Sequence, residues 1–200
     1  MSAQKRPYRM TRRAELEEQT RRRITESAVA LHETVGPART SISAIAEHAG
    51  VRRSTVYRHF PDEEALLDAC SSHWAAANPP PDPGAWSSIA DPAERTRAAL
   101  SDLYAYYART EPMYVSLLRD EPLMPALERR LRDFYDYLDS IRHDLAAGRG
   151  LRGRRAHVVR AAIGHAIAFP TWRSLAREQG LANADAVVLM SRLVEDAAAG

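Results

Sequence analysis

Two short runs of apolar residues, joined by a glycine, lie about a quarter of the way along the chain. Ile42, Ile45, Ala46 and Ala49 follow one another at the i, i+3, i+4, i+7 spacing of a helix, so they form one buried stripe. Gly50 then interrupts the pattern, because glycine adopts the positive φ of a tight turn without steric cost. The pattern predicts two short helices that cross closely around this turn.

The second of these helices keeps a polar face free. Val51, Val56 and Phe60 form its apolar stripe, and the side chains between them can each contact a phosphate or a base edge of DNA. Ser41 is placed to cap the first helix, whose N-terminal amides then face a phosphate. The arrangement indicates a helix-turn-helix DNA-binding module, and an ordinary pair of packed helices with solvated charges is the alternative. The predicted DNA-binding residues are Ser41, Arg52, Arg53, Ser54, Thr55, Tyr57, Arg58 and His59.

A longer helix precedes this module. Leu16, Ile24, Ala28 and Leu31 mark its apolar face over residues 14–34, and it is expected to brace the two short helices. Residues 1–13 are basic and lack apolar periodicity, which predicts a flexible arm able to contact phosphates or the minor groove. The arginines at 21–23 fit a DNA contact and a solvated helix surface equally well.

The rest of the chain repeats the helical pattern. Pro61 ends the second short helix, and Asp62 caps a connector helix over residues 63–77, before a proline-rich loop. Because no segment alternates apolar and polar residues as a strand does, we predict an all-α fold of about nine helices. Pro170 falls inside one of them and is expected to kink it and free a carbonyl. The further predicted helices cover residues 92–110, 114–119, 125–147, 154–178 and 183–198.

Charge separates the two ends of the chain. Residues 1–60 hold 12 Lys and Arg against 6 Asp and Glu, whereas residues 61–200 hold 16 against 20. A basic N-terminal module on a mildly acidic body fits the binding of a polyanion at one end. We therefore expect a helix-turn-helix DNA-binding domain over residues 1–62 and a larger helical domain over 63–200. Cys70 is the single cysteine, and no apolar N-terminal run resembles a signal peptide, so a cytoplasmic location is expected.

Catalytic and metal-binding motifs are missing from the sequence. It contains no Gly-x-Ser-x-Gly elbow, His-Glu-x-x-His motif, glycine-rich phosphate loop or paired-cysteine framework. His143, His157 and His165 are spaced too irregularly to indicate a metal site. We expect neither an enzyme nor a bound cofactor or metal.

The segment from Ile42 to Leu67 resembles the TetR family of transcriptional regulators. It contains an Ile-Ala…Ala-Gly-Val turn, a Thr-hydrophobic-Tyr-x-His-Phe helix and a following acidic-Ala-Leu-Leu. A less diagnostic likeness covers residues 165–175. The resemblance implies that Arg53, Ser54 and Thr55 meet base edges, with Arg53 reading a guanine, that Tyr57 and His59 hold phosphates, and that Arg58 does either. Glu63 departs from the pattern, because the family usually has a phosphate-binding lysine there.

The resemblance also implies a ligand-responsive homodimeric repressor, which a small apolar or aromatic effector releases from its operator by shifting the connector helix near 66–74. A helical DNA-binding or oligomerising protein without ligand response is the alternative. The candidate effector-binding residues, for which a purely structural role is the alternative, are Trp74, Tyr104, Tyr107, Phe134, His165 and Phe169. The last two helices are the candidate dimer interface, or else core of the monomer, through Val158, Val159, Ala162, Ile163, Ala166, Ile167, Val187, Val188, Met190, Leu193 and Val194.

Overall fold

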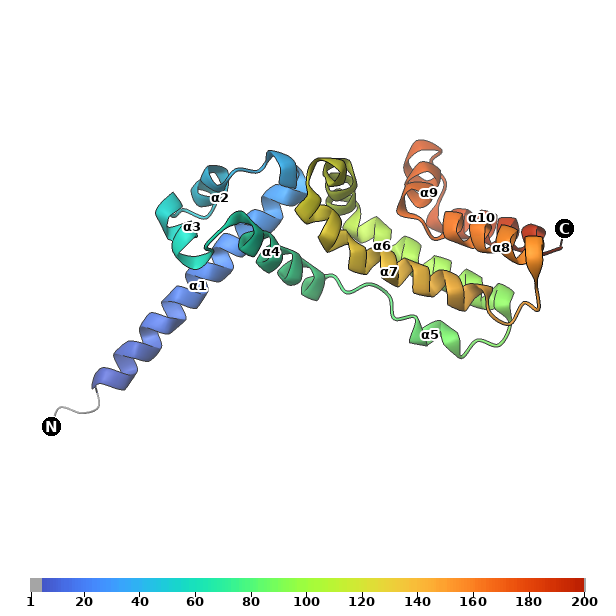
Figure 1. The fold of residues 1–200 in the computed structure, drawn as a ribbon, viewed down its shortest axis with the longest axis horizontal. Coiled ribbons are helices and arrows are strands. Elements are labelled where there is room, and N and C mark those ends of the chain that lie inside the picture. Colours follow the sequence, from blue (N-terminus) through green and yellow to red (C-terminus); the bar gives the residue numbers. More distant parts are fainter. Residues whose placement is uncertain (1–4, 200) are drawn as a thin grey trace. The chain divides into compact units, whose positions relative to one another are not determined.

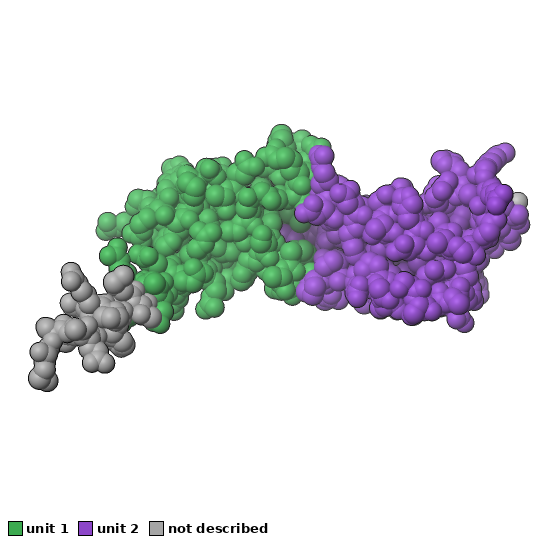
Figure 2. All heavy atoms as spheres, turned by 60° about the horizontal axis from the view of Figure 1, so that its bottom comes forward, with its two compact units in different colours: residues 1–78, 115–130 green, residues 79–114, 131–200 purple. Residues whose placement is uncertain are grey.

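The computed structural model describes residues 5–199, with side chains from residue 12 onward, and every regular element in that range is helical. The predicted all-α fold is confirmed. The chain forms two compact units, which Figure 2 shows in different colours: unit 1 is residues 1–78 with 115–130, and unit 2 is residues 79–114 with 131–200. The α-helices are α1 (Lys5–Thr34), α2 (Ile42–His48), α3 (Arg53–His59), α4 (Glu63–Ala77), α5 (Gly84–Ser87), α6 (Pro92–Asp120), α7 (Pro125–Ala146), α8 (Gly153–Ala166), α9 (Phe169–Arg173) and α10 (Asn183–Ala199).

Side-chain caps begin several of these helices where the sequence predicts them. The Ser41 hydroxyl accepts a hydrogen bond from the Ala44 amide at 3.1 Å at the start of α2. The Asp62 carboxylate accepts from the Ala65 amide at 2.7 Å at the start of α4. Each bond satisfies an amide that has no partner within its own helix, which fixes where that helix begins.

Unit 1 encloses one hydrophobic core between α1, α2, α3 and α4 (Figure 1). Ile24 and Ala28 of α1 are fully buried there, together with the predicted apolar stripe of α2. Leu16, predicted to lie on the bracing face of α1, is 55% exposed. That prediction was wrong because α1 meets the other helices only further along its length. The remaining core residues are Ile42, Ile45, Ala46, Ala49, Val56, Phe60, Leu66, Leu67 and Cys70.

Helix α1 begins earlier than its apolar pattern indicates. It starts at Lys5, so the predicted flexible arm is wrong from that residue on, and residues 1–4 lie outside the described range. Pro7 is tolerated in the first turn, where its missing amide would have no helical partner. Ion pairs one turn apart, Arg13–Glu17 at 3.2 Å and Arg22–Glu26 at 3.6 Å, support the exposed side of the helix.

Helix α6 runs without interruption from Pro92 to Asp120, whereas the sequence predicted an end before Pro112 and a separate helix over 114–119. Pro112 removes one amide donor, and helices usually stop or kink at such a residue. Here the side chains that follow it, Met113 and Tyr114, are buried like Tyr107 before it. Packing on both sides of the proline therefore outweighs the lost backbone hydrogen bond.

A break near Pro170 replaces the single helix predicted over residues 154–178. α8 ends at Ala166, α9 starts at Phe169, and residues 174–178 form a π-helical turn. The carbonyls of Ala166 and Ile167 accept hydrogen bonds from the hydroxyls of Tyr104 at 2.8 Å and Tyr107 at 2.6 Å. The expectation of a free carbonyl at this break was wrong, because α6 supplies donors for both.

The apolar stripes of α8 and α10 mostly face each other within unit 2. Val159, Ile163, Ala166, Ile167, Val187, Met190 and Val194 are buried, so they fill the core of the monomer and are not available to a partner. The prediction that they face a second copy was wrong, since sequence periodicity does not distinguish the two kinds of contact. The large apolar side chains that remain exposed on these helices are Val158, Val188, Leu189 and Leu193.

Candidate nucleic-acid interface

The turn between α2 and α3 depends on the backbone of Gly50. Its φ is 62°, and a Cβ added there would meet nothing within 4 Å. Glycine is therefore required for its conformation and not for space. The Gly50 amide donates to the Glu47 carbonyl at 3.0 Å and the Val51 amide donates to the Ala46 carbonyl at 2.9 Å, which ends α2 and directs the chain into α3.

Helix α3 separates its apolar and polar side chains as the sequence predicts. Val56 and the following Phe60 are each 1% exposed and anchor the helix in the core of unit 1. Thr55 and His59 are half-buried at the edge of this contact. The structure brings the other predicted DNA-binding side chains of this region together on the outer surface, where Arg52, Arg53, Ser54, Tyr57 and Arg58 are exposed.

Arg53 and Tyr57 lie against each other on the exposed face. The Arg53 guanidinium donates a hydrogen bond to the Tyr57 hydroxyl at 3.2 Å and lies 5.5 Å from the centre of its ring. That hydrogen bond raises the pKa of Arg53. Because one turn of helix separates the two residues, the pair holds the guanidinium in one orientation before any ligand arrives.

His59 differs from the residues around it. Burial and the nearby charges of Arg58 and Arg21 lower its pKa, so the imidazole is neutral at pH 7. Its Nε2 atom is buried and has no hydrogen-bond partner in the described part of the chain. The neutral ring can present Nε2–H to a phosphate only after the ring turns outward, because Nε2 has no exposed surface in this conformation.

Ser41 has a second task at this surface. Its side chain is exposed and its oxygen already accepts the Ala44 amide as the cap of α2. The hydroxyl proton is still available to a phosphate, because a serine hydroxyl both donates and accepts. Glu63, at the start of α4, lies close enough to Arg53 to act on its charge. The departure that the sequence shows at this position is thus next to the basic face.

A buried carboxylate fastens the loop after α1 within unit 1. Asp120, at the end of α6, is 1% exposed and accepts the Ala38 amide at 3.1 Å and the Arg119 guanidinium at 2.7 Å. Arg119 also donates to the Val35 carbonyl at 2.8 Å. The hydrogen bond from Arg119 is the main cause that lowers the pKa of Asp120. Gly36 has φ 99°, and a Cβ there would overlap both Arg119 and Asp120.

Sequence reasoning did not identify this contact. Arg119 and Asp120 carry no motif, and the Ala38 amide that donates to Asp120 lies 82 positions away along the chain. Two ion pairs in the same unit were also missed. Arg129 pairs with Glu64 at 2.7 Å and Arg130 pairs with Asp68, so the start of α7 is tied to α4.

The predicted effector-binding residues do not form one group. Trp74 belongs to unit 1, on α4, and is half-buried. In unit 2, Tyr104, Tyr107 and Phe169 are buried, and the rings of Tyr107 and Phe169 lie 5.4 Å apart. His165 is exposed, where its ring lies 3.3 Å from the Thr171 hydroxyl.

Tyr114, which sequence reasoning overlooked, completes the aromatic cluster of unit 2. Its ring lies 4.8 Å from Phe134 and 5.4 Å from Phe169, and its hydroxyl lies 3.0 Å from that of Tyr106. Burial raises the pKa of both tyrosines, so their hydroxyls stay protonated. Tyr114 follows Tyr107 by seven residues on the same face of α6, and this spacing was the available signal.

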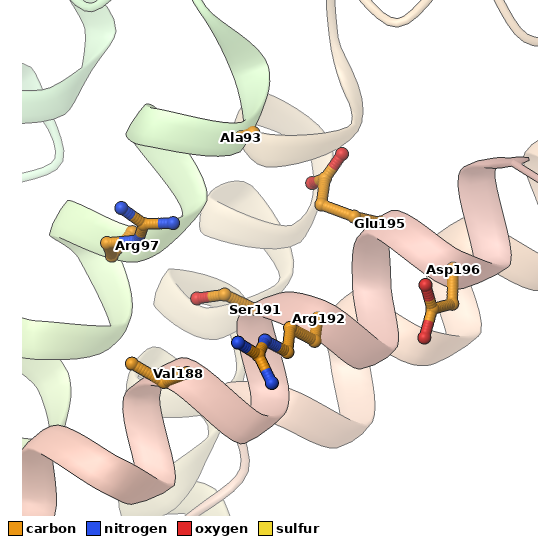
Figure 3. Close-up of a pocket in the computed structure, with 7 residues that line it drawn as sticks. All are labelled: Ala93, Arg97, Val188, Ser191, Arg192, Glu195 and Asp196. Atoms are coloured by element: carbon orange, nitrogen blue, oxygen red, sulfur yellow. The ribbon is translucent and has the colours of Figure 1, made fainter.

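A surface groove of about 370 Å³ lies between α6 and α10 (Figure 3). Arg97 projects from α6 toward Ser191 of α10, and Glu195 at one end of the groove accepts a hydrogen bond from Arg149 at 2.9 Å. None of the predicted effector-binding residues lines this groove. Within residues 5–199, no helix is long and apolar enough to cross a membrane, and the described side chains form no group of three or more that could hold a metal ion.

These features define the class of the protein: an all-helical chain that presents a helix-turn-helix module with a basic outer face. Residues 24–70 match the family described as "Bacterial regulatory proteins, tetR family". The resemblance to the TetR family of transcriptional regulators is therefore confirmed. The matched range contains α2, α3 and their turn, together with the core of unit 1 that holds them. No curated protein is similar enough in sequence to count as a match.

Solved structures agree over nearly the whole chain. A TetR-like transcriptional regulator from Rhodococcus sp. RHA1 has a TM-score of 0.64 at 17% identity, covering 90% of this chain and 96% of its own. A TetR transcription regulator from Haloarcula marismortui gives 0.52 at 15%, covering 91% and 97%. The fatty acid degradation regulator FadR from Bacillus halodurans gives 0.52 at 15%, covering 90% and 95%. The chain thus has the fold of these regulators.

Proposed function

We propose that the protein is a sequence-specific DNA-binding transcriptional regulator of the cytoplasm, which binds its operator as a homodimer through α3 and is released by a small apolar or aromatic effector. In this proposal residues 1–62 form the DNA-binding domain and residues 63–200 the domain for dimerisation and effector binding. One observation carries it. Val56 and Phe60 bury one side of α3, so five polar side chains, three of them arginines, share its outer face.

Two-fold pairing follows from the length of α3. A helix of seven residues reaches few base pairs, and helix-turn-helix proteins of this kind usually bind two half-sites about 34 Å apart. The exposed Val158, Leu189 and Leu193 on α8 and α10 offer an apolar surface for such pairing. Contact between the last two helices of each copy would bury them in a four-helix interface.

The aromatic cluster of unit 2 supports an apolar or aromatic effector. Its rings come from α6, α7 and α9, and its hydroxyls are paired with one another or with the carbonyls at the end of α8. A ligand that enters between these rings displaces aromatic contacts and gives others in return. The fold is shared with FadR from Bacillus halodurans, a fatty acid degradation regulator, which is consistent with an apolar effector.

Helix α6 offers a route from the effector to the DNA-binding module. It is one continuous helix that carries Tyr104 and Tyr107 of the aromatic cluster as well as Asp120, which holds the loop after α1. A displacement of α6 would act on that loop and, through the ion pairs of α7, on the connector α4. We expect the coupling to reduce operator affinity by about 5- to 150-fold, the usual range for two linked sites.

Selection of bound DNA from a random pool tests the proposal. The wild-type chain is expected to enrich a palindromic sequence with two half-sites. Arg53→Gln should lower affinity for that sequence by about tenfold to a hundredfold, because an arginine–guanine pair contributes about 1–3 kcal/mol of discrimination. Arg160→Gln, which removes the same charge from the exposed face of α8, is the control and should bind as the wild type does.

Fluorescence anisotropy with the selected duplex and with a scrambled one distinguishes the alternatives. A regulator loses specific binding on Arg53→Gln while its weak binding to scrambled DNA changes little. Equal losses on both duplexes would identify a non-specific DNA-binding protein. Enrichment of no sequence at all would contradict the proposed function.

A further inference from the structure

Helix α1 carries a basic run, Arg21, Arg22 and Arg23, whose side chains differ in exposure and in contacts. Arg22 is exposed and pairs with Glu26 at 3.6 Å, and Arg23 is exposed. Arg21 is half-buried and turns toward α3 instead. Its Nη1 donates a hydrogen bond to the carbonyl of His59 at 2.7 Å, and its guanidinium lies 4.3 Å from the centre of the Phe60 ring.

Helix α3 needs support of this kind. It is only seven residues long, and a helix of two turns is unstable unless other parts of the protein hold it. Its N-cap residue, Arg52, makes no side-chain cap, and its C-cap residue, Phe60, has an extended φ of −133°. The last carbonyls of such a helix have no helical partner and carry partial negative charge, so a guanidinium is well suited to the position.

We propose that Arg21 is a positioning residue of the DNA-binding module, which caps the C-terminus of α3 and so fixes the orientation in which α3 presents Arg53 and Tyr57. It acts through the His59 carbonyl and the Phe60 ring and not through a DNA phosphate. The hydrogen bond fixes the end of the helix, and the ring contact fixes the residue that anchors it in the core of unit 1. This inference rests on the proposed function for its effect on DNA, whereas its effect on α3 is independent of DNA.

The geometry of the contact favours this assignment over a phosphate contact. The hydrogen bond joins residues 38 positions apart, so it links two separate helices. One donor of Arg21 is already engaged, and one face of the guanidinium is covered by an aromatic ring. Arg23 is the better candidate for a purely electrostatic contact, since it is exposed and carries the same charge.

Amide hydrogen exchange on the full-length chain without DNA tests the cap directly. Arg21→Gln is expected to speed exchange of the protected α3 amides by about tenfold, the loss of one hydrogen bond to a charged group. Arg21→Lys keeps a hydrogen-bond donor but not the planar stack on Phe60, so its α3 exchange rate should lie between those of the wild type and Arg21→Gln. Arg23→Gln should exchange as the wild type does. Unchanged α3 exchange in Arg21→Gln would overturn the proposal.

Operator binding at several salt concentrations tests the consequence. A positioning residue changes affinity and leaves the salt dependence unaltered, whereas loss of one phosphate contact lowers the slope of log K against log salt by about 1. We expect Arg21→Gln to lose about tenfold in operator affinity at an unchanged slope, with partial rescue by Arg21→Lys. A lower slope together with wild-type exchange would show a phosphate contact and overturn the proposal. A wild-type chain that discriminates no DNA sequence would contradict the proposed function, and the exchange data alone would then decide whether Arg21 caps α3.

Discussion

At the scale of single residues, the outer face of α3 places a basic pair beside a carboxylate. Arg53 is oriented by Tyr57 and is influenced by Glu63 from the start of α4. A carboxylate near the basic face opposes the approach of a polyanion, because it repels phosphates over about 8 to 10 Å at ordinary ionic strength. The resemblance to the TetR family implies a phosphate-binding lysine at this position, where this chain has Glu63. We therefore expect Glu63 to weaken the proposed binding to DNA of any sequence.

Glu63→Lys is accordingly expected to tighten binding. The change removes a negative charge and adds a phosphate contact, so it should raise the salt slope by about 1 and strengthen specific and non-specific binding alike. Anisotropy titrations at several salt concentrations measure both. Asp144→Lys makes the same charge change at an exposed position of α7, outside the proposed dimer surface, and is the control. A gain restricted to one DNA sequence would mean that position 63 reads bases.

In unit 2, Arg149 stabilises the fold. Its side chain is 5% exposed and donates to the carbonyls of Leu145 and Pro92, to the Thr96 hydroxyl and to the Glu195 carboxylate. It therefore ties α6, α7 and α10 together. Removing it takes a donor from each of these acceptors, of which the Pro92 carbonyl keeps the Thr96 hydroxyl, and each buried group left unpaired costs about 1–3 kcal/mol.

We expect Arg149→Ala to lower the free energy of unfolding of unit 2 by about 2–4 kcal/mol. Solvent reaches part of Glu195, which keeps this loss below the sum of the separate hydrogen bonds. Hydrogen exchange of the α6 and α10 amides measures it. Arg152→Ala, at an exposed position three residues on, should change stability little. Similar exchange in the two variants would show that the hydrogen bonds of Arg149 contribute little to the stability of unit 2.

At the scale of helices, His32 gives α1 a dependence on pH. The side chain is 8% exposed, and its Nδ1 lies 3.5 Å from the sulfur of Cys70 on α4. Burial lowers the pKa of His32 from 6.5 to about 4, and the charge of Asp120 opposes this only in part. Cys70 cannot supply a compensating charge, because burial raises the pKa of its thiol.

The unfolded chain therefore binds more protons than the folded one between these two values. Stability of unit 1 is complete above pH 6.5 and falls as pH decreases toward 4, by up to about 3 kcal/mol in total. Hydrogen exchange of the α1 and α4 amides between pH 4 and 7, corrected for intrinsic exchange, is the measurement. His32→Leu should flatten the dependence, whereas His73→Gln on α4 should retain it. A wild-type stability that is constant over this interval would contradict the role of His32.

The helices also show which elements can be predicted from the sequence and which cannot. α2, α3 and α4 were predicted because periodic apolar residues, a glycine turn and the caps Ser41 and Asp62 are all local signals. The N-terminal part of α1 was missed because its stability comes from helix-forming residues and ion pairs and not from an apolar face. The continuous α6 and the break after α8 depend on packing around Pro112 and on donors from Tyr104 and Tyr107, which no local pattern reveals.

In the candidate site, too, local features could be predicted from the sequence and long-range contacts could not. Exposure of Arg52, Arg53 and Tyr57 follows from the burial of Val56 and Phe60, so the face of α3 could be predicted from its own sequence. The contacts that hold the module in place could not, since Arg21 reaches a carbonyl 38 positions away and Asp120 an amide 82 positions away. Long-range hydrogen bonds to the backbone leave no signature in residue type.

At the scale of the whole molecule, the proposed operator binding requires two copies. Because most of the predicted interface residues are buried within unit 2, the proposed pairing would rest on the side chains that stay exposed, chiefly Val158, Leu189 and Leu193. Leu189 and Leu193 lie one turn apart on α10, so they form a continuous apolar strip. A charge in the middle of this strip would be buried without a partner in the dimer, yet fully solvated in the monomer.

Leu189→Glu is therefore expected to leave the monomer folded and to shift the chain from dimer to monomer at micromolar concentration. Analytical ultracentrifugation measures the mass, and circular dichroism checks that the helices persist. Operator affinity should fall at least as far as in Arg53→Gln, since a single α3 then engages a single half-site. Leu123→Glu places the same charge at a residue that is 70% exposed and far along the sequence from α8 and α10, and this control should remain dimeric. If Leu189→Glu stays dimeric with full operator affinity, pairing uses another surface, and the exposed strip of α10 has a different role.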